Sequence, residues 1–198
     1  MKTPLRPDLL RAALALLLAA WLPAAQAFDL GTLMGLLAAR KGAEARFTEE
    51  RTVSSLDSPL RSSGTLSYTA PDRFVRQTLE PRPEAMEVAG NSVTLRRGGR
   101  TRTLQLDAVP ELAALVDAMR GTLSGDAAVL QRHFKVELTG SNPKWVLLLT
   151  PTETRLRQQV SDIEIVGSGA DVRSIDLRLA GGDRALMLIE PLPAPARK

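Results

Sequence analysis

The stretch GTLSYTAPDRFVRQ, residues 64–77, contains two strand patterns on either side of a Pro-Asp break. Before the break, Leu66, Tyr68 and Ala70 alternate with polar residues, which is typical of a strand with one buried face. A second strand pattern, RFVRQTL at residues 73–79, follows the break at once. Because so short a turn joins antiparallel strands, the stretch predicts a β-hairpin.

Strand patterns of the same kind continue on both sides of this hairpin, at the spacing of roughly 8–12 residues that is typical of all-β folds. The predicted strands are ARFTEERTV, GTLSYTA, RFVRQTL, EAMEVA, NSVTLRR, TRTLQL, HFKVELTG, KWVLLLTP, VSDIEIVG, VRSIDLRLA and RALMLIE. In the most regular strands, the residues expected to face the core are Ile163, Ile165, Ile175, Leu177 and Leu179. Those expected to face water are Asp162, Glu164, Asp176 and Arg178.

Three short amphipathic helices interrupt the strands. They are expected at residues 30–41, 110–120 and 126–130. Asp29 and Asp126 are suitable N-caps for the first and third, and Gly42 and Gly121 stand where the first two should end. Their apolar faces need a surface to cover, and the sheet is the one available.

These elements predict a mainly β protein with short helices. The expected architecture is a single strongly curved antiparallel sheet, an incomplete β-barrel, with the helices covering its concave face. An interface made only of side chains, between helices and sheet, can open without breaking a backbone ladder. An apolar cavity that opened at this interface would suit a lipid chain, but composition alone favours an ordinary closed core.

The first 27 residues have the pattern of a secretory signal peptide. Basic residues (Lys2, Arg6 and Arg11) precede an apolar run at residues 12–22, and AQA at residues 25–27 suits a cleavage site. The apolar run is shorter than the ~20 residues that span a bilayer, so we favour a cleaved signal over an uncleaved anchor. We therefore expect export to the periplasm of a Gram-negative bacterium.

The expected domain organisation follows from these ends. Residues 1–27 are the signal, residues 28–190 form one domain, and residues 191–198, rich in Pro and Ala, form a flexible tail. The chain has no cysteine, so no disulfide supports the domain. Without residues 1–27 the chain has 23 basic and 21 acidic residues, about +2, and few aromatic residues. This balance does not indicate a nucleic-acid partner.

Catalytic and metal-binding patterns are weak. His133 is the single histidine, and it has no cysteine partner and no GxSxG motif to work with. Glu49 and Glu50 adjoin on a predicted strand and so point to opposite faces. The sequence RRGGRT has the composition of a hairpin turn rather than of a phosphate-binding loop. We expect no enzyme activity, no metal and no cofactor.

Several of these segments, taken in order, resemble the LolA family of periplasmic carriers of outer-membrane lipoproteins. RFTEERTV resembles that family's F-x-Q strand, and SSGTLSYTAPDRFVRQTLEP resembles its G-x-L…P-x-x-F…P segment. EVAGNSVTL resembles the hairpin that follows, VPELAALVDAMRGTLSGD the helical insertion, and LLLTP a later strand end. The resemblance implies an unclosed antiparallel barrel whose helical lid covers a hydrophobic cavity.

The resemblance also implies which residues bind acyl chains. The expected cavity and lid residues are Phe47, Leu66, Tyr68, Phe74, Leu112, Leu115, Val116, Met119, Trp145, Leu147, Ile163, Ile165, Ile175 and Leu177. Two positions depart from the family: Glu49 stands where Gln is usual, and Ala70 stands where an arginine gates the lid. Arg73 and Arg76 are therefore the gating candidates, reaching lid carbonyls from across the turn.

The implied function is a monomeric carrier that takes acyl chains from the inner to the outer membrane. Its partners would be a lipidated protein or other lipid, an inner-membrane transporter and an outer-membrane acceptor. Two alternatives stay open at this point. The cargo could be a lipid of polyene or glycolipid assembly, or the protein could be an RseB-like sensing or interaction module.

Overall fold

The computed structural model describes residues 28–193, which contain eleven strands and a small set of helices. The strands are β1 (Gly42–Thr52), β2 (Leu60–Thr69), β3 (Arg73–Glu80), β4 (Glu84–Ala89), β5 (Ser92–Arg97), β6 (Arg100–Gln105), β7 (Phe134–Ser141), β8 (Lys144–Pro151), β9 (Val160–Ser168), β10 (Asp171–Leu179) and β11 (Arg184–Pro191). The helices are α2 (Leu30–Ala38), α3 (Pro110–Ser124), α4 (Ala127–His133) and α5 (Thr154–Arg157), with a 3₁₀ turn η1 (Leu106–Ala108).

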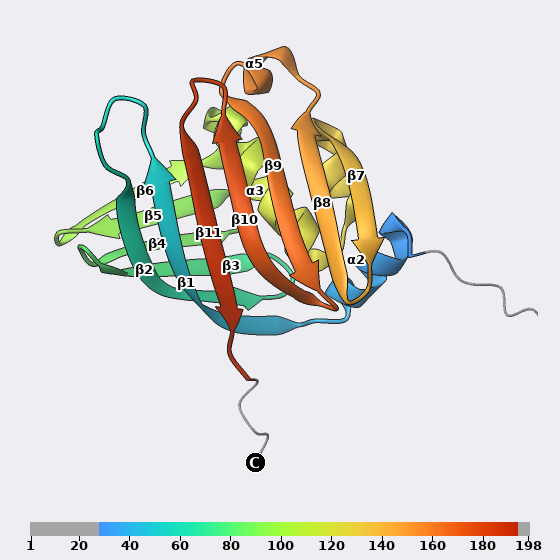
Figure 1. Cartoon of the computed structure of the whole chain (residues 1–198). Helices are drawn as coiled ribbons and strands as arrows, with labels where there is room; N and C mark the ends of the chain where they lie inside the picture. Colours follow the sequence, from blue (N-terminus) through green and yellow to red (C-terminus); the bar gives the residue numbers. More distant parts are fainter. Residues whose placement is uncertain (1–27, 194–198) are drawn as a thin grey trace, which may run out of the picture.

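All eleven strands form one antiparallel sheet, in the order β6-β5-β4-β3-β2-β1-β11-β10-β9-β8-β7. Strand β1 pairs with β11, so the two ends of the described chain meet in the middle of the sheet. Within residues 28–193 no ladder joins the edge strands β6 and β7, so the barrel is incomplete. The predicted fold class is confirmed, and Figure 1 shows the sheet curling around the helices.

The position of the helices follows from the strand order. The segment that contains η1, α3 and α4 connects β6 to β7, which are the two opposite edges of the sheet. A chain that runs from one edge to the other must cross a face of the sheet, and the concave face offers the apolar surface that amphipathic helices need.

The hairpin predicted from residues 64–77 is formed by β2 and β3, with Tyr68 opposite Phe74 and Leu66 opposite Arg76. Gly64 lies opposite Phe47 of β1 and close to the backbone of Gln77. A Cβ atom at this position would collide with the carbonyl of Gln77, so the close approach requires glycine.

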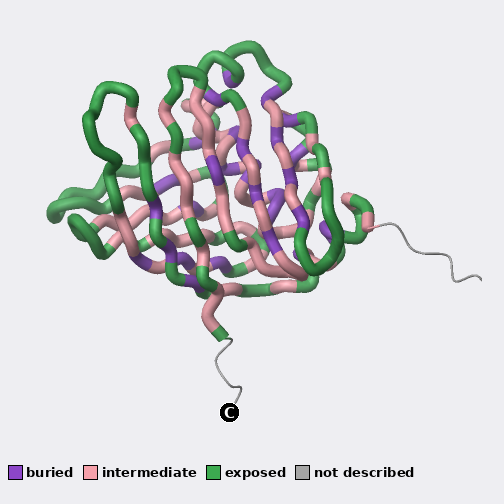
Figure 2. The backbone as a smooth tube through the Cα atoms, viewed as in Figure 1, coloured by how far each residue is buried: buried purple, intermediate pink, exposed green. Residues whose placement is uncertain are grey.

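The core is divided into two helix-covered parts and one part made of strands alone. The first core combines Leu33 and Leu37 of α2 and Ala118 of α3 with side chains of β7–β10. The second core packs Val116 of α3 on Val88 and other side chains of β4 and β5. The third cluster lies between them in the middle of the sheet, and its buried members are Ala45, Phe47 and Leu66. Figure 2 shows the buried positions along the strands and under the helices.

Three helix ends differ from the prediction, and the simplest case is α4, which continues to His133 rather than ending at residue 130. Helix α2 ends at Ala38 rather than near residue 41, because the backbone beyond it already pairs with β2: Ala70 N–H donates to the carbonyl of Lys41. Helix α3 continues through Gly121 to Ser124 and ends at Gly125, whose φ of 68° is left-handed. Gly121 is therefore inside the helix, and glycine suits this position because a Cβ there would lie 2.7 Å from the side chain of Leu130 in α4.

The chain termini agree only partly with the expected domain limits. Strand β11 continues to Pro191, and Leu192 N–H donates to the carbonyl of Glu44 at 2.8 Å, so the sheet extends into the segment expected to be a tail. The expected signal peptide lies outside the described residues. Among residues 28–193, no helix has both the length and the apolar character needed to span a membrane.

Asp176 differs from the expectation that it faces water. It is on the outer face of β10, but only 4% of its surface is exposed because Arg178 and Arg184 cover it. Arg184 donates to both of its carboxylate oxygens, at 2.7 and 2.9 Å, and Arg178 donates at 2.8 Å. Burial alone would raise the pKa of Asp176, but the hydrogen bond from Arg184 and the charges of both arginines outweigh it and hold the pKa below its usual 3.8.

We expect Asp176→Asn to lower the free energy of unfolding at pH 7 by about 1.5–3 kcal/mol, the usual contribution of a hydrogen bond to a charged group. A lowered pKa in the folded state means that this stability is present above the pKa of the unfolded chain and is lost as the pH falls through the folded value. The difference from the wild type should therefore shrink below about pH 3.8. Urea unfolding at a series of pH values measures the difference in stability between the variant and the wild type. A difference that does not change with pH would contradict an ionised Asp176 in the folded protein.

Candidate functional site

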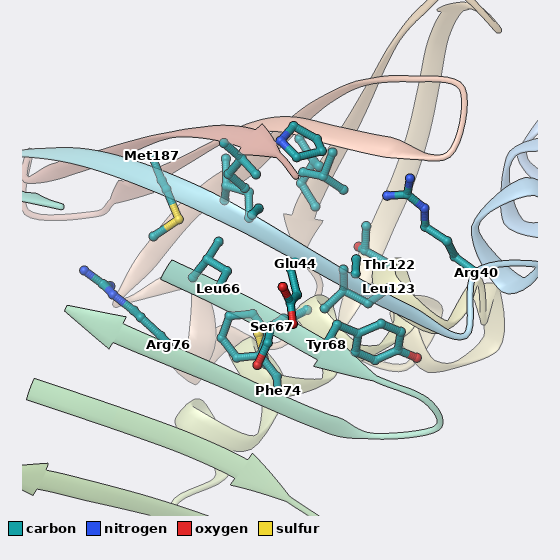
Figure 3. Close-up of a pocket in the computed structure, with 18 of the residues that line it drawn as sticks. Arg40, Glu44, Leu66, Ser67, Tyr68, Phe74, Arg76, Thr122, Leu123 and Met187 are labelled. Carbon is teal, nitrogen blue, oxygen red and sulfur yellow. The ribbon is translucent and has the colours of Figure 1, made fainter. Parts of the chain in front are cut away.

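A cavity of about 240 Å³ lies between the helices and the middle strands of the sheet (Figure 3). Its wall is drawn from α2, α3, β1–β4 and β9–β11, and is mostly apolar. The lining residues are Leu37, Arg40, Ala43, Glu44, Ala45, Leu66, Ser67, Tyr68, Phe74, Arg76, Met86, Met119, Thr122, Leu123, Ile165, Ala170, Val172, Ile175, Met187, Ile189 and Pro191.

The cavity occupies the seam between the two helix-covered cores. One face of α3 packs into the first core and the other face, which includes Met119, packs into the second. The floor between them is the strand-only cluster, to which Met187 and Ile189 of β11 also belong. Within residues 28–193 no helix residue belongs to that cluster, so the helices lie over this part of the sheet and leave the cavity between.

Two hydroxyl groups on the wall, those of Tyr68 and Thr122, are hydrogen-bonded to nearby carbonyls. The hydroxyl of Tyr68 donates to the carbonyl of Pro71 at 3.1 Å, and Thr122 donates to the carbonyl of Ala118, one turn earlier in α3, at 2.8 Å. Burial, with a smaller contribution from the charge of Asp72, raises the pKa of Tyr68 above its usual 10.0. The phenol therefore stays uncharged at neutral pH.

Two arginines stand at opposite ends of the cavity in Figure 3. Arg40, between α2 and β1, forms an ion pair with Asp171 at the start of β10. Arg76 of β3 forms a nearly buried ion pair with Glu49 of β1, and Nη2 of the arginine lies 2.6 Å from Oε2 of the glutamate. Its guanidinium lies over the ring of Phe47, 4.6 Å from the ring centre.

The structure brings together some of the residues expected in the cavity and places the others in the cores. Those that line it are Leu66, Tyr68, Phe74, Met119, Ile165 and Ile175. Those in the first core are Leu115, Trp145, Leu147, Ile163 and Leu177, and those in the second are Leu112 and Val116. Phe47 is buried in the strand-only cluster, beneath Arg76.

Several lining residues were not expected from the sequence, chiefly Leu123 of α3 and Met187 and Ile189 of β11. The alternation in RALMLIE places Met187 and Ile189 on one face, which was a usable signal. The alternation does not show which strand lies beside β11. That partner is β1, more than 130 residues earlier in the chain.

The hydrogen bonds of the two gating candidates differ from the expectation. Arg73 is on the outer face of β3 and pairs with Glu87 at 3.0 Å, and Arg76 bonds Glu49 and Ser62 rather than a carbonyl of the helices. A hydrogen bond between α3 and the strand region does exist, but its arginine comes from the helix. Arg120 of α3 donates to the carbonyl of Gly90, in the turn after β4.

His133 has a structural environment. Its Nδ1 lies 2.9 Å from Oε1 of Glu153, and its Nε2 lies 3.4 Å from Oδ2 of Asp117 in α3. Both ring nitrogens thus face carboxylates, which leaves neither placed to accept a proton from a nucleophile. Within the described residues, no group of three His, Cys, Asp or Glu side chains is arranged to hold a metal ion.

A family model described as "Outer membrane lipoprotein carrier protein LolA-like" matches residues 22–193. The chain belongs to this LolA-like family. Membership in the LolA-like family supports a periplasmic role in binding lipids or lipoproteins. No curated protein sequence matches the chain.

The comparison with solved structures finds matches of low identity and with TM-scores below 0.5. A LolA superfamily protein of Nitrosomonas europaea is 9% identical with a TM-score of 0.43, over 85% of this chain and 96% of that one. A putative outer membrane lipoprotein-sorting protein domain from Vibrio parahaemolyticus is 8% identical with a TM-score of 0.46, over 85% and 92%. A chain of the Pseudomonas aeruginosa MucA/MucB complex is 17% identical with a TM-score of 0.37, over 85% and 59%.

Proposed function

We propose that this protein is a periplasmic carrier that binds acyl chains of lipoproteins or related lipids in the cavity and takes them from the inner to the outer membrane. The observation that supports this most directly is the apolar cavity between two separate cores, over a cluster of strand residues that includes no helix residue within residues 28–193. Each methylene buried there contributes about 0.8 kcal/mol to binding.

The volume of the cavity supports a mechanism in which the helices move. At about 240 Å³ it exceeds the roughly 150 Å³ that holds one benzene ring, but it is below the roughly 300–1,000 Å³ of pockets that enclose whole ligands. A complete acyl chain therefore requires α3 to move away from the floor. Such a movement breaks side-chain contacts and the bond from Arg120, while every strand ladder stays intact.

Membership in the LolA-like family supports the remainder of the proposal. The protein would receive its cargo from an inner-membrane transporter and deliver it to an outer-membrane acceptor, as a monomer. In this proposal the acyl chain is held by apolar contacts with the cavity wall, so the protein would work without a cofactor and without catalysis.

Native mass spectrometry of the delipidated protein, mixed with a purified lipoprotein or with single-chain lipids, tests the proposal. We expect complexes at micromolar lipid and transfer of the lipoprotein from inner-membrane to outer-membrane vesicles. A protein that binds neither lipoprotein nor lipid, but captures a protein partner, would contradict the carrier function and favour an interaction module.

Leu123→Glu is expected to weaken lipid binding at least tenfold, with a change of less than about 1 kcal/mol in stability. Leu123 lines the cavity but belongs to none of the three packed clusters, so its substitution removes little packing. A carboxylate there has to be dehydrated when a lipid enters, which costs binding energy.

Leu188→Glu is the matched control for this variant. Leu188 is 55% exposed on the outer face of β11, so the same substitution there should leave both binding and stability unchanged. Lipid affinity and thermal unfolding, measured on both variants, make the comparison. Equal affinities for the two variants would place the ligand outside the cavity.

A further inference from the structure

One residue that lines the cavity carries a buried polar atom without a hydrogen-bond partner. In the described part of the chain, three buried side-chain atoms make no hydrogen bond: Nε of Arg76, Nε of Arg120, and Oδ1 of Asp171, which is in the ion pair with Arg40. Of the three residues, Arg76 is the one that lines the cavity. Leaving a buried donor unpaired is costly, more so for a charged group, so this N–H calls for an acceptor.

The surroundings of the guanidinium define where that acceptor can come from. Phe47 covers one face of the group. The two terminal nitrogens point to Glu49, at 2.6 and 3.4 Å, and one of them also reaches Ser62 at 3.3 Å. Ser62 in turn donates to Glu49 at 3.1 Å. Glu49 and Ser62 thus occupy the two terminal nitrogens, and Nε is left without a hydrogen-bond partner.

Resting on the proposed function, we infer that this end of the cavity binds the carbonyl oxygen of a neutral acyl ester or amide. The carbonyl accepts the hydrogen bond from Nε of Arg76, and its alkyl chain lies along the floor past Met187 and Leu66, both beside Arg76 in Figure 3. The ligand is thereby held by its acyl linkage as well as by its apolar chain.

The charge of the site favours a neutral carbonyl over a free carboxylate. Glu49, 9% exposed, already neutralises Arg76, so a fatty-acid carboxylate would bring a second negative charge next to it. Arg51 lies 4.0 Å from Glu49, but its side chain is 52% exposed and water screens it. Esters and amides add an acceptor without adding charge.

The affinities of three ligands of similar length, measured by displacement of the fluorophore 1-N-phenylnaphthylamine from the purified protein, test the inference. Methyl decanoate offers a neutral carbonyl, decanoate a charged one and undecane none. We expect the ester to bind at least about tenfold more tightly than undecane, as a hydrogen bond to a charged donor provides. It should also bind more tightly than decanoate.

The paired variant Glu49→Met/Arg76→Leu should abolish the preference for the ester while still binding undecane. The substitution of both partners avoids leaving a buried charge. The matched control is Glu87→Gln/Arg73→Leu, which removes the Arg–Glu pair on the outer face of the same strand and should keep the preference.

Each outcome is decisive. Equal affinities for ester and undecane in the wild type, or a preference that survives in Glu49→Met/Arg76→Leu, would overturn the inference and leave the lipid-binding proposal standing. Failure to bind undecane, decanoate and the ester alike would overturn the proposed function, and the inference with it.

Discussion

Replacement of Arg76 by leucine is expected to lower the free energy of unfolding by about 3 kcal/mol, at the lower end of the range for breaking a buried ion pair. The substitution removes the cation from Glu49, which is 9% exposed and keeps only weaker support from Ser62, at 3.1 Å, and from the exposed Arg51, at 4.0 Å. The value is at the lower end because the Arg76 side chain retains 20% exposure, which lets water reach the site.

Urea unfolding followed by the fluorescence of Trp145, the one tryptophan outside residues 1–27, measures this loss. The paired variant Glu49→Met/Arg76→Leu should recover most of the stability, since exchanging both members of a buried pair for apolar residues is often neutral. Arg73→Leu, which removes an exposed pair on the opposite face, should cost less than about 1 kcal/mol. A paired variant as unstable as Arg76→Leu would mean that the arginine acts by packing on Phe47.

Replacement of Trp145 by alanine is expected to cost about 3–5 kcal/mol, as for other large aromatic side chains in a core. Trp145 is fully buried in the first core, and its indole N–H donates to the carbonyl of Gly169 at 2.9 Å. The ring lies directly against Gly167 in the paired strand β9, where any Cβ atom would collide with it. Loss of the ring leaves a cavity and an unsatisfied carbonyl together.

The reverse substitution, Gly167→Ala, should cost about 1–3 kcal/mol by overpacking against the indole. Because the two residues are in contact, the double variant Gly167→Ala/Trp145→Ala should be more stable than the sum of the single effects predicts. Gly181→Ala is the matched control, since no atom lies within 4 Å of its Cβ position, and it should be nearly neutral. Circular dichroism follows the unfolding of all four variants; strict additivity would contradict the contact.

Most of the local structure could be predicted from the sequence. Alternation identified the eleven strands, and the side chains of Asp29 and Asp126 cap α2 and α4 as expected. These features depend on hydrogen bonds and side-chain periods that span a few residues, so they are visible in a short window. The helix ends near Gly42 and Gly121 were wrong: the backbone after α2 is hydrogen-bonded to Ala70, next to β2, and Gly121 packs against Leu130 from inside α3.

The candidate site was predicted less completely. The residues of the opening hairpin, Leu66, Tyr68 and Phe74, do line the cavity, but Trp145 and Leu147 are core residues of the far half of the sheet. Apolar residues that alternate on a strand have the same pattern whether a helix covers them or a cavity does. The difference depends on where α3 crosses the sheet, which no local pattern records.

The sequence by itself determined the strands, their inward and outward faces and the presence of an amphipathic helical segment in the middle of the strand sequence, because each depends on neighbouring residues. The tertiary structure alone decided that β1 meets β11, that Glu49 finds Arg76, and that an unfilled seam remains between two cores. Those features arise where segments far apart in the chain come together, and their geometry follows from how the whole sheet curves around the helices.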